Sequence, residues 1–178
     1  MSVQWKFEEQ FSFSDEKFSK IYRFFVIEPP LEDTSKRGKS LSEFGWSQNS
    51  ITNVLKKQIP SLNKNWKTIP AKNSKSSEEI EQNVKNLCKK NKILDEVSER
   101  REVFIHTNMK NHKTKSLFYT IRCAFAHGAF NKKEYFGEQF YFLENRNKQK
   151  LRGRIVVKEE TLLRIIEIIE NPKTYEKK

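Results

Sequence analysis

Among the side chains that could carry out chemistry, an arginine and a histidine in one short segment stand out. His127 lies five positions after Arg122, in the segment Arg122-Cys-Ala-Phe-Ala-His127, and directly before Gly128. A guanidinium can bind a phosphate through two hydrogen bonds, and an imidazole can move a proton near neutral pH. The pair therefore fits chemistry on a phosphodiester bond.

The element that must position this pair is an apolar helix predicted from about Lys113 to His127, with Gly128 at its C-terminal cap. Five positions on a helix correspond to about 140° of rotation and roughly 7.5 Å of rise, so the two side chains do not share one stripe. They would have to converge through the reach of Arg122 or across two subunits. The carbonyl end of a helix favours a protonated imidazole, which suits a proton donor.

The sequence contains no other motif that is typical of a catalytic, phosphate-binding or metal site. It has no Gly-rich phosphate loop and no His/Cys/Asp set at metal spacing, and 34 residues lie between Cys88 and Cys123. We therefore expect two free thiols, no metal and no cofactor. We also find no secretory signal and no apolar run of the ~18 residues that a membrane span needs, so we expect a soluble, cytoplasmic protein without a membrane partner.

The charge is strongly positive and unevenly distributed. The formal net charge is +12 and the sequence pI is about 9.6, whereas residues 1–34 carry four Lys/Arg against seven Asp/Glu. Residues 110–158 carry twelve Lys/Arg against three Glu, a net of +9. Such a cluster favours RNA as a partner, with Lys132 and Lys133 as phosphate contacts that read no base sequence. The alternative is a solvated lysine-rich surface.

The other histidines and the aromatic residues have weaker functional interpretations. We expect His106 and His112 to be structural, with His112 a contact at the rim of the site. Some aromatic residues could stack on unpaired bases, but aromatic runs in a hairpin more often belong to the core. These are Tyr135, Phe136 and Tyr141.

Apolar spacing predicts mainly helices. We expect a short strand or extended arm in 1–13, a helix over about 15–27, a broken helical pattern over 41–59 and a surface loop over 61–77. The longest helix is predicted from Ser76 to about residue 108 and should pair with the 113–127 helix as an antiparallel hairpin. Its apolar stripe is Ile80, Val84, Leu87, Leu94, Val97 and Phe104.

After Gly128 the pattern changes. Residues 139–144 and 153–157 are short aromatic and β-branched runs on either side of a polar turn, which predicts a β-hairpin. A final helix from Thr161 should end at Asn171-Pro172. The predicted fold class is therefore mainly α, a helical bundle with a small C-terminal β-hairpin and a last helix, in one domain over 1–178.

The segment Arg122-Cys-Ala-Phe-Ala-His127-Gly128-Ala-Phe resembles the Arg-x4-His-Gly motif of the HEPN superfamily, and the resemblance extends over roughly 76–170. It leaves the N-terminal part, 1–75, without a role. The resemblance implies a HEPN-like all-α bundle that forms a homodimer and cleaves RNA without a metal, by attack of the RNA's own 2′-hydroxyl. Arg122 would support the phosphate and His127 would act as general acid/base. It also implies a toxin or anti-phage defence effector, with an inhibitory protein partner.

One position departs from the common motif. Active members often have a polar residue after the arginine, where this chain has Cys123. A thiol is a poor substitute for a polar hydrogen-bonding group. The alternative function is therefore a catalytically silent HEPN-like module that binds RNA, nucleotide or a protein partner. A third possibility is a basic adaptor for ribosomes or anionic membranes.

Overall fold

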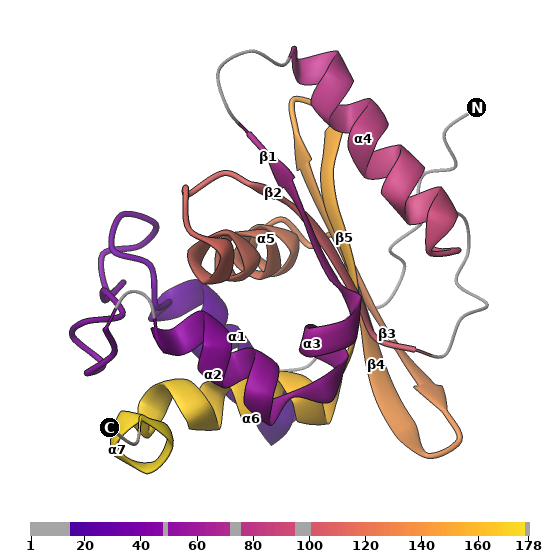
Figure 1. Cartoon of the computed structure of the whole chain (residues 1–178). Helices are drawn as coiled ribbons and strands as arrows, with labels where there is room; N and C mark the ends of the chain where they lie inside the picture. Colours follow the sequence, from indigo (N-terminus) through magenta and orange to yellow (C-terminus); the bar gives the residue numbers. More distant parts are fainter. Residues whose placement is uncertain (1–14, 48–49, 72–75, 95–100, 177–178) are drawn as a thin grey trace.

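The computed structural model describes residues 15–47, 50–71, 76–94 and 101–176 and has three layers, with one sheet between two layers of helices (Figure 1). The sheet has the strand order β1-β2-β5-β4-β3, with β1 and β2 parallel and the other pairs antiparallel. The predicted mainly α, HEPN-like bundle is therefore wrong, because this is an α/β fold. The strands are β1 (Trp66–Pro70), β2 (Val103–Asn108), β3 (Phe130–Tyr135), β4 (Glu138–Asn147) and β5 (Lys150–Lys158).

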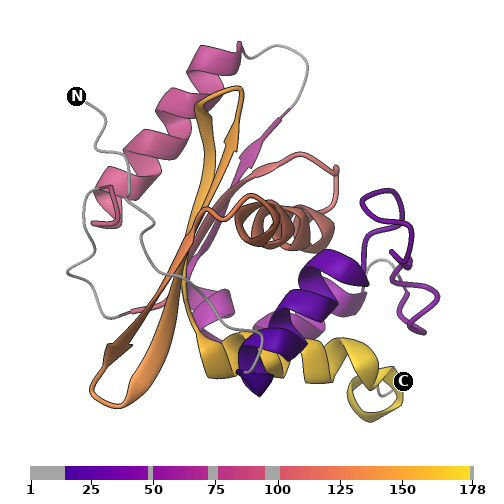
Figure 2. The ribbon, with the colours of Figure 1, turned by 180° about the vertical axis from the view of Figure 1, so that it is seen from behind.

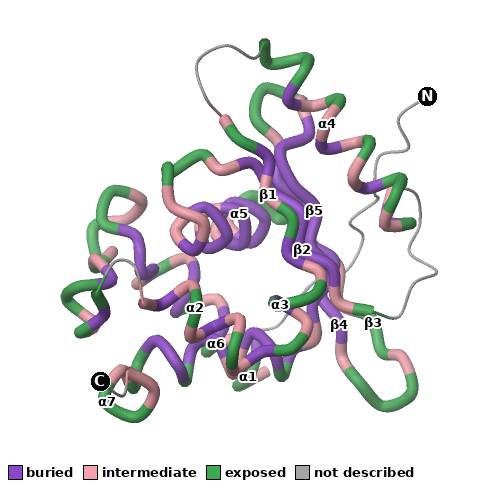
Figure 3. Tube along the Cα trace, viewed as in Figure 1, coloured by how far each residue is buried: buried purple, intermediate pink, exposed green. Residues whose placement is uncertain are grey.

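Alternate residues of the central strands serve two different cores. Phe104 and Ile155 face one core, whereas their neighbours Ile105 and Val156 face the other. Nearly all of β5 is buried, and Figure 3 shows the buried class running through the middle of the sheet. A strand that is buried on both faces reads as a continuous apolar run, without the alternation that marks a half-buried strand.

Burial of the central strands on both faces explains why the prediction of one long helix from Ser76 to about residue 108 is wrong. Helix α4 (Ser77–Lys90) begins at the predicted cap, because the Ser76 hydroxyl accepts from Glu79 N, but it ends at Asn91. Residues 103–108 form β2, whose first five residues are buried. Phe104 lies in β2, and it is separated only by coincidence by a helical interval from the apolar residues of α4. Val97, in the same stripe, lies outside the described residues.

The region predicted as a surface loop also contains regular structure. Helix α3 (Pro60–Asn65) starts with a proline at its first position, and β1 follows directly and pairs with β2. The chain then returns to the sheet through α4, which contacts β1, β2 and β5. The 61–77 prediction fails because β1 is a short edge strand with polar neighbours on both sides.

The antiparallel helix pair predicted from 76–108 and 113–127 does not form. Helix α4 packs on one face of the sheet, whereas α5 (Lys113–Ala126) packs on the other (Figures 1 and 2). The apolar residues of two amphipathic helices have the same spacing whether the helices pack against each other or on opposite faces of a sheet. Sequence periodicity alone cannot separate these arrangements.

Several local predictions are confirmed. The β4–β5 hairpin forms, α6 (Glu159–Glu170) ends at Asn171, and α7 (Pro172–Tyr175) follows. The predicted helix over 15–27 is α1 (Glu16–Tyr22), capped by Asp15, continued by the π-helical turn η1 (Arg23–Ile27). The strand or arm predicted in 1–13 lies outside the described residues.

The N-terminal helices and α2 (Ser50–Gln58) cover α5 from outside. Phe18 of α1 contacts Phe125 of α5, with ring centroids 6.3 Å apart, and Phe25 contacts Phe118 at 5.9 Å. Helix α6 lies beside α1 and contacts β4 and β5. As a result α5 is buried on most sides and is held rigidly.

Gly153 on β5 permits the close approach of α5 and β2. A Cβ atom at this position would lie 2.8 Å from the backbone oxygen of Ile105 and 3.0 Å from the Thr120 Cγ2 atom. The obstacle is backbone on one side and a packed helix on the other, so neither can move cheaply.

We expect Gly153→Ala to lower the free energy of unfolding by about 2 kcal/mol, because overpacking a core costs roughly 1–3 kcal/mol. Urea denaturation measures this change. Asn147→Ala, at the exposed end of β4, is the control and should change stability by less than about 0.5 kcal/mol. Equal stabilities for both variants would contradict the close packing described here.

Candidate functional site

Helix α5 carries the predicted site at its C-terminal end. Its N-cap is His112, whose Nδ1 accepts from Lys115 N, and its C-cap is His127. Gly128 follows with a φ of 66°, the left-handed conformation that ends many helices. The helix predicted over 113–127 is confirmed, and five of its apolar residues are buried on its inner side: Leu117, Phe118, Ile121, Ala124 and Phe125.

The structure places His127 at the surface. The residue is exposed, its backbone N–H donates to Cys123 O, and its side chain has no hydrogen bond within the described ranges. His127 is therefore open to a substrate in solution.

Arg122 is partly buried and points towards the 28–40 segment. Its Nη2 donates to the Thr34 carbonyl oxygen over 3.0 Å. Its Nε atom is buried and has no hydrogen-bond partner. One N–H donor is thus held by the protein, whereas another lacks an acceptor.

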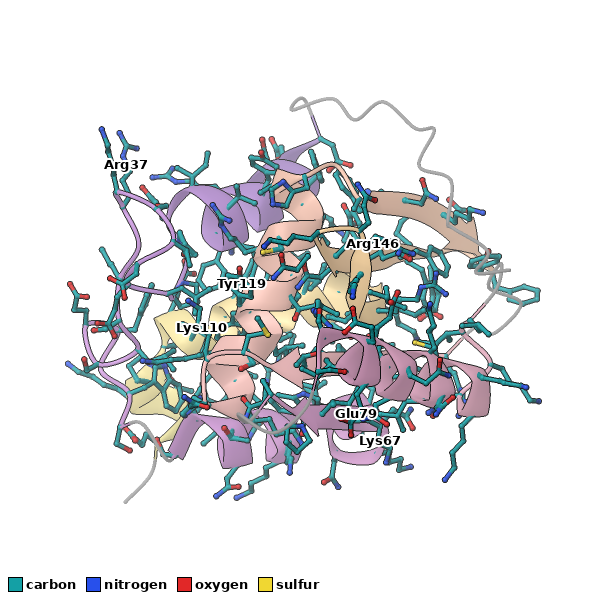
Figure 4. All side chains as sticks on the ribbon, turned by 90° about the horizontal axis from the view of Figure 1, so that it is seen from above. Arg37, Lys67, Glu79, Lys110, Tyr119 and Arg146 are labelled. Atoms are coloured by element: carbon teal, nitrogen blue, oxygen red, sulfur yellow. The ribbon has the colours of Figure 1, made fainter. Side chains whose placement is uncertain are left out.

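The structure does not join Arg122 and His127 by a hydrogen bond in the part of the chain that it describes, as their offset on the helix leads one to expect. On α5, Arg122 lies next to Cys123 and one turn after Tyr119. Burial, and then Cys123, raise the pKa of Tyr119. Lys110 Nζ lies 4.8 Å from the Tyr119 ring centroid, and Figure 4 shows both residues by α5.

Cys123, the departure from the common motif, is buried, with 5% of its surface exposed. A residue in that position contacts the protein interior rather than a ligand in solvent. Cys88 is also a free, buried thiol, and burial raises its pKa to about 12. Burial of Cys88 thus disfavours its thiolate, which is the form that acts as a nucleophile or metal ligand.

The two lysines proposed as phosphate contacts face opposite sides of β3. Lys132 Nζ forms ion pairs with Glu159 at 2.6 Å and with Asp15 at 2.9 Å. Burial disfavours its charge, but the hydrogen bonds to these carboxylates outweigh burial and raise its pKa. Lys133 is exposed, with Nζ 6.0 Å from the Phe142 ring centroid. RNA contact stays a prediction for both, and Lys133 has the freer ammonium group.

Much of the basic charge over 110–158 is paired within the molecule. Arg154 is 1% exposed and binds Glu144, which also accepts from Arg146. Arg152 reaches Ser77 at the start of α4. Further lysines pair with acidic residues on other elements, namely Lys115 with Glu32, Lys150 with Glu78 and Lys158 with Glu138. A charge cluster in the sequence is therefore not one exposed patch.

The remaining histidines and aromatic residues are structural where the structure shows contacts. His106 is fully buried on β2, and Tyr141 is buried with its hydroxyl donating to Glu159. The core interpretation is thus confirmed for Tyr141. Phe136, by contrast, is 85% exposed in the β3–β4 turn.

The sequence offered no signal for the contact between Lys113 of α5 and Trp66 of β1. The Lys113 Nζ atom lies 4.6 Å from the Trp66 ring centroid. This contact depends on the packing of α5 against the sheet. Lys67, the next residue of β1, points to the other face of the sheet, and Figure 4 shows it among the side chains near α4.

Comparison of the chain with protein-family models, with curated proteins and with solved structures gave no match. The HEPN resemblance therefore depends on the short motif alone, and the fold does not add to it. None of the helices that the structure describes is long and apolar enough to cross a membrane. Within the same residues, no group of three or more His, Cys, Asp or Glu side chains could hold a metal ion.

Buried His106 gives a pH prediction. Trp66 Nε1 donates to its Nε2 over 2.7 Å, so this nitrogen must be unprotonated, and Nδ1 lies 3.2 Å from Thr107 O. Burial lowers the pKa of His106 to about 4 in the folded state. Since the unfolded chain binds this proton near pH 6.5, stability should fall as pH decreases from about 6.5 to about 4.

The decrease in the free energy of unfolding that is due to His106 should approach about 3 kcal/mol at low pH, since one pKa unit corresponds to about 1.4 kcal/mol. Denaturant titrations of the wild type and His106→Gln at several pH values measure it. Glutamine can accept the hydrogen bond from Trp66 but does not titrate. Both proteins have the same carboxylates, so the contribution of these groups cancels in the difference between the two unfolding free energies. Parallel stability curves would show that His106 is not the titrating group.

Proposed function

We propose that this protein is a metal-independent endoribonuclease in which His127 transfers protons and Arg122 supports the scissile phosphate. The observation that carries the proposal is the exposed imidazole of His127 at the C-terminal end of a rigidly packed helix. It is the only exposed histidine among the described residues, since His106 is buried and His112 is partly buried as a helix cap.

The reaction needs no group beyond the chain and the RNA. An imidazole removes the proton of a 2′-hydroxyl, whose oxygen attacks the adjacent phosphorus. The bond from phosphorus to the 5′-oxygen then breaks, and that oxygen takes a proton. The products are a 2′,3′-cyclic phosphate and a free 5′-hydroxyl. The Arg122 guanidinium would stabilise the added negative charge on the phosphate.

A second subunit would supply the arginine or histidine that a single α5 helix cannot place beside its partner. Because Arg122 and His127 lie on different sides of α5, we propose a homodimer in which the motifs of both copies face one cleft. Such an enzyme would act in the cytoplasm as a toxin or anti-phage defence effector, held in check by an inhibitory protein. These roles depend on the motif resemblance alone.

A second candidate function is RNA binding without cleavage, and two observations favour it. Cys123 is buried, so it cannot replace the polar group of active motifs at the reacting phosphate. Arg122 already donates to the Thr34 carbonyl oxygen. In this candidate His127 would serve only as the helix cap.

The catalytic prediction concerns His127. His127→Ala should lower the rate of RNA cleavage in EDTA by about 10² to 10⁴, the usual loss when general acid/base catalysis is removed. Gel analysis of labelled single-stranded RNA, with identification of the cyclic phosphate end, measures this. His127→Gln should be equally inactive, because glutamine fills the space but transfers no proton.

Arg122→Lys and thermal unfolding provide the controls. Lysine keeps the charge but loses the forked donor, so cleavage by Arg122→Lys should be weak. All variants should unfold at temperatures close to that of the wild type. If the pure wild type binds RNA but yields no cyclic phosphate, and His127→Ala binds equally well, the binding function replaces the nuclease. Cleavage that stops in EDTA would refute the mechanism.

The binding prediction uses two exposed lysines, one on β3 and one in the β4–β5 turn. RNA affinity should fall with salt, with a slope of about −0.7 for each phosphate contact on a single strand. Lys133→Ala should remove about one such contact and so make the salt slope shallower. Lys148→Ala, in the β4–β5 turn, removes the same charge at another place and is the matched control. Fluorescence anisotropy at several salt concentrations measures both slopes. An equal effect of the two variants would show that only net charge matters.

A further inference from the structure

A cavity of about 340 Å³ lies where α1 and η1 meet the loop after η1 and the C-terminal end of α6. Its lining includes Lys20 of α1, Phe24 of η1, Lys39 and Phe44 of the loop, and Glu170 of α6. In Figure 1 the loop and this end of α6 lie on the same side of the molecule, away from the sheet. Pockets of about 300–1,000 Å³ bind small ligands, so this cavity is large enough for one.

Two phenylalanines form an aromatic wall of the cavity. The rings of Phe24 and Phe44 lie with their centroids 6.2 Å apart. Phe24 is 6% exposed and contacts Phe25, which in turn packs against Phe118 of α5 with ring centroids 5.9 Å apart. Phe44 is only partly buried. The wall is therefore anchored in the core through Phe24, whereas part of the Phe44 ring is accessible to a ligand.

The charges of the lining are only partly compensated within the protein. The Arg23 Nε and Nη2 atoms donate to the two carboxylate oxygens of Glu28, over 3.0 and 3.3 Å, so this pair neutralises itself. Lys20 and Lys39 are exposed, and neither forms an ion pair in the part of the chain that the structure describes. The Lys39 Nζ atom lies 6.0 Å from the Phe44 ring centroid. A free ammonium group and an accessible aromatic ring thus lie side by side.

Lys17 provides a comparison on the same helix. Its Nζ lies 2.6 Å from a carboxylate oxygen of Glu160 on α6. The contact between α1 and α6 therefore supplies a carboxylate for Lys17, and none for Lys20 one turn later. A single lysine without a partner is ordinary on a protein surface. Lys20 and Lys39 differ from such a residue because both line one cavity that also has an aromatic wall.

We propose that this cavity binds one nucleotide unit, with its phosphate at Lys20 and Lys39 and its base against Phe44. Ammonium groups are strong hydrogen-bond donors to phosphate oxygens, and an aromatic side chain can stack on any base. The carboxylate of Glu170 repels a bare anion but can accept hydrogen bonds from ribose hydroxyls. The mixed lining therefore favours a nucleotide over inorganic phosphate.

This site goes beyond the proposed nuclease. None of the residues that line the cavity belongs to α5, which carries Arg122 and His127. The cavity can therefore bind its ligand in a protein that cleaves nothing. The ligand is either a free nucleotide or one nucleotide of an RNA strand, since both present the same phosphate, ribose and base.

Isothermal titration calorimetry with adenosine 5′-monophosphate (AMP) tests the proposal. The wild type should bind AMP at one site. Phe44→Leu keeps an apolar side chain against Phe24 but removes the aromatic ring, and it should lower the affinity about tenfold, as expected for the loss of one base–aromatic stack. Lys39→Met should lower it by at least about tenfold, because a hydrogen bond to a charged group is lost.

Lys36→Met is the matched control for the charge. Lys36 is an exposed lysine of the same loop that does not line the cavity, so this variant should bind AMP like the wild type. All three variants should unfold, without ligand, at temperatures close to that of the wild type. Adenosine and inorganic phosphate each lack one half of the ligand and should bind more weakly than AMP. No saturable binding of AMP at tens of millimolar, or equal affinities of the wild type, Phe44→Leu and Lys39→Met, would overturn the proposal.

A competition experiment separates the two sources of the nucleotide. Single-stranded RNA without a terminal phosphate should displace AMP if the cavity holds one nucleotide of an RNA strand. If AMP binds and RNA does not compete, the ligand is a free nucleotide, and the site stands in either case. His127→Ala should bind AMP normally, so failure of the nuclease and failure of this site give different results.

Discussion

The pairing of β5 with β2 on one side and with β4 on the other places an almost wholly buried strand in the middle of the molecule. Such a strand must be covered on both faces, since its side chains alternate between them. One cover is α4, and the other is α5 with the helices that surround it. The position of α5, and therefore of every candidate site residue on it, follows from this requirement.

Burial on both faces also determines which charges remain available to a ligand. Arg154 and Glu144 lie on neighbouring strands, each with a side chain that is 1% exposed, and form a pair inside the smaller core. Lys132 is held between α1 and α6 by its two carboxylates. The positive charges that could act on a partner are consequently those at the ends and edges of the elements, such as Lys133 on β3 and Lys113 at the start of α5.

Much of the local structure could be predicted from the sequence. Helix α5 with its Gly128 cap, the β4–β5 hairpin and α6 each have a clear pattern and a recognisable end. Strand β2 could not be predicted, because a short apolar run that is buried on both faces has no distinguishing period. Strand β1 ends in Pro70 and follows a short helix without a pause, so its sequence resembles a loop.

The candidate sites were predictable to different degrees. The helix end at His127 could be recognised because Arg122, His127 and Gly128 lie within seven residues of one another. The contact of Lys113 with Trp66 joins residues that are far apart in the sequence, through the packing of α5 on the sheet. No local pattern encodes that contact. The buried position of Cys123, which weakens the catalytic interpretation, likewise depends on tertiary packing.

The single parallel pair in the sheet has a consequence for the order of folding. Strands β3, β4 and β5 are joined by tight turns, so each pairing closes only a short loop, whereas β1 and β2 can pair only after the intervening segment with α4 has crossed the sheet. Closing a longer loop costs more chain entropy before any contact repays it. The meander of β3–β5 should therefore form first, and the β1 edge should dock last and open most readily in the native state. Because Trp66 lies on that edge, backbone amide exchange that is faster there than in β3–β5 would report on the final step of assembly.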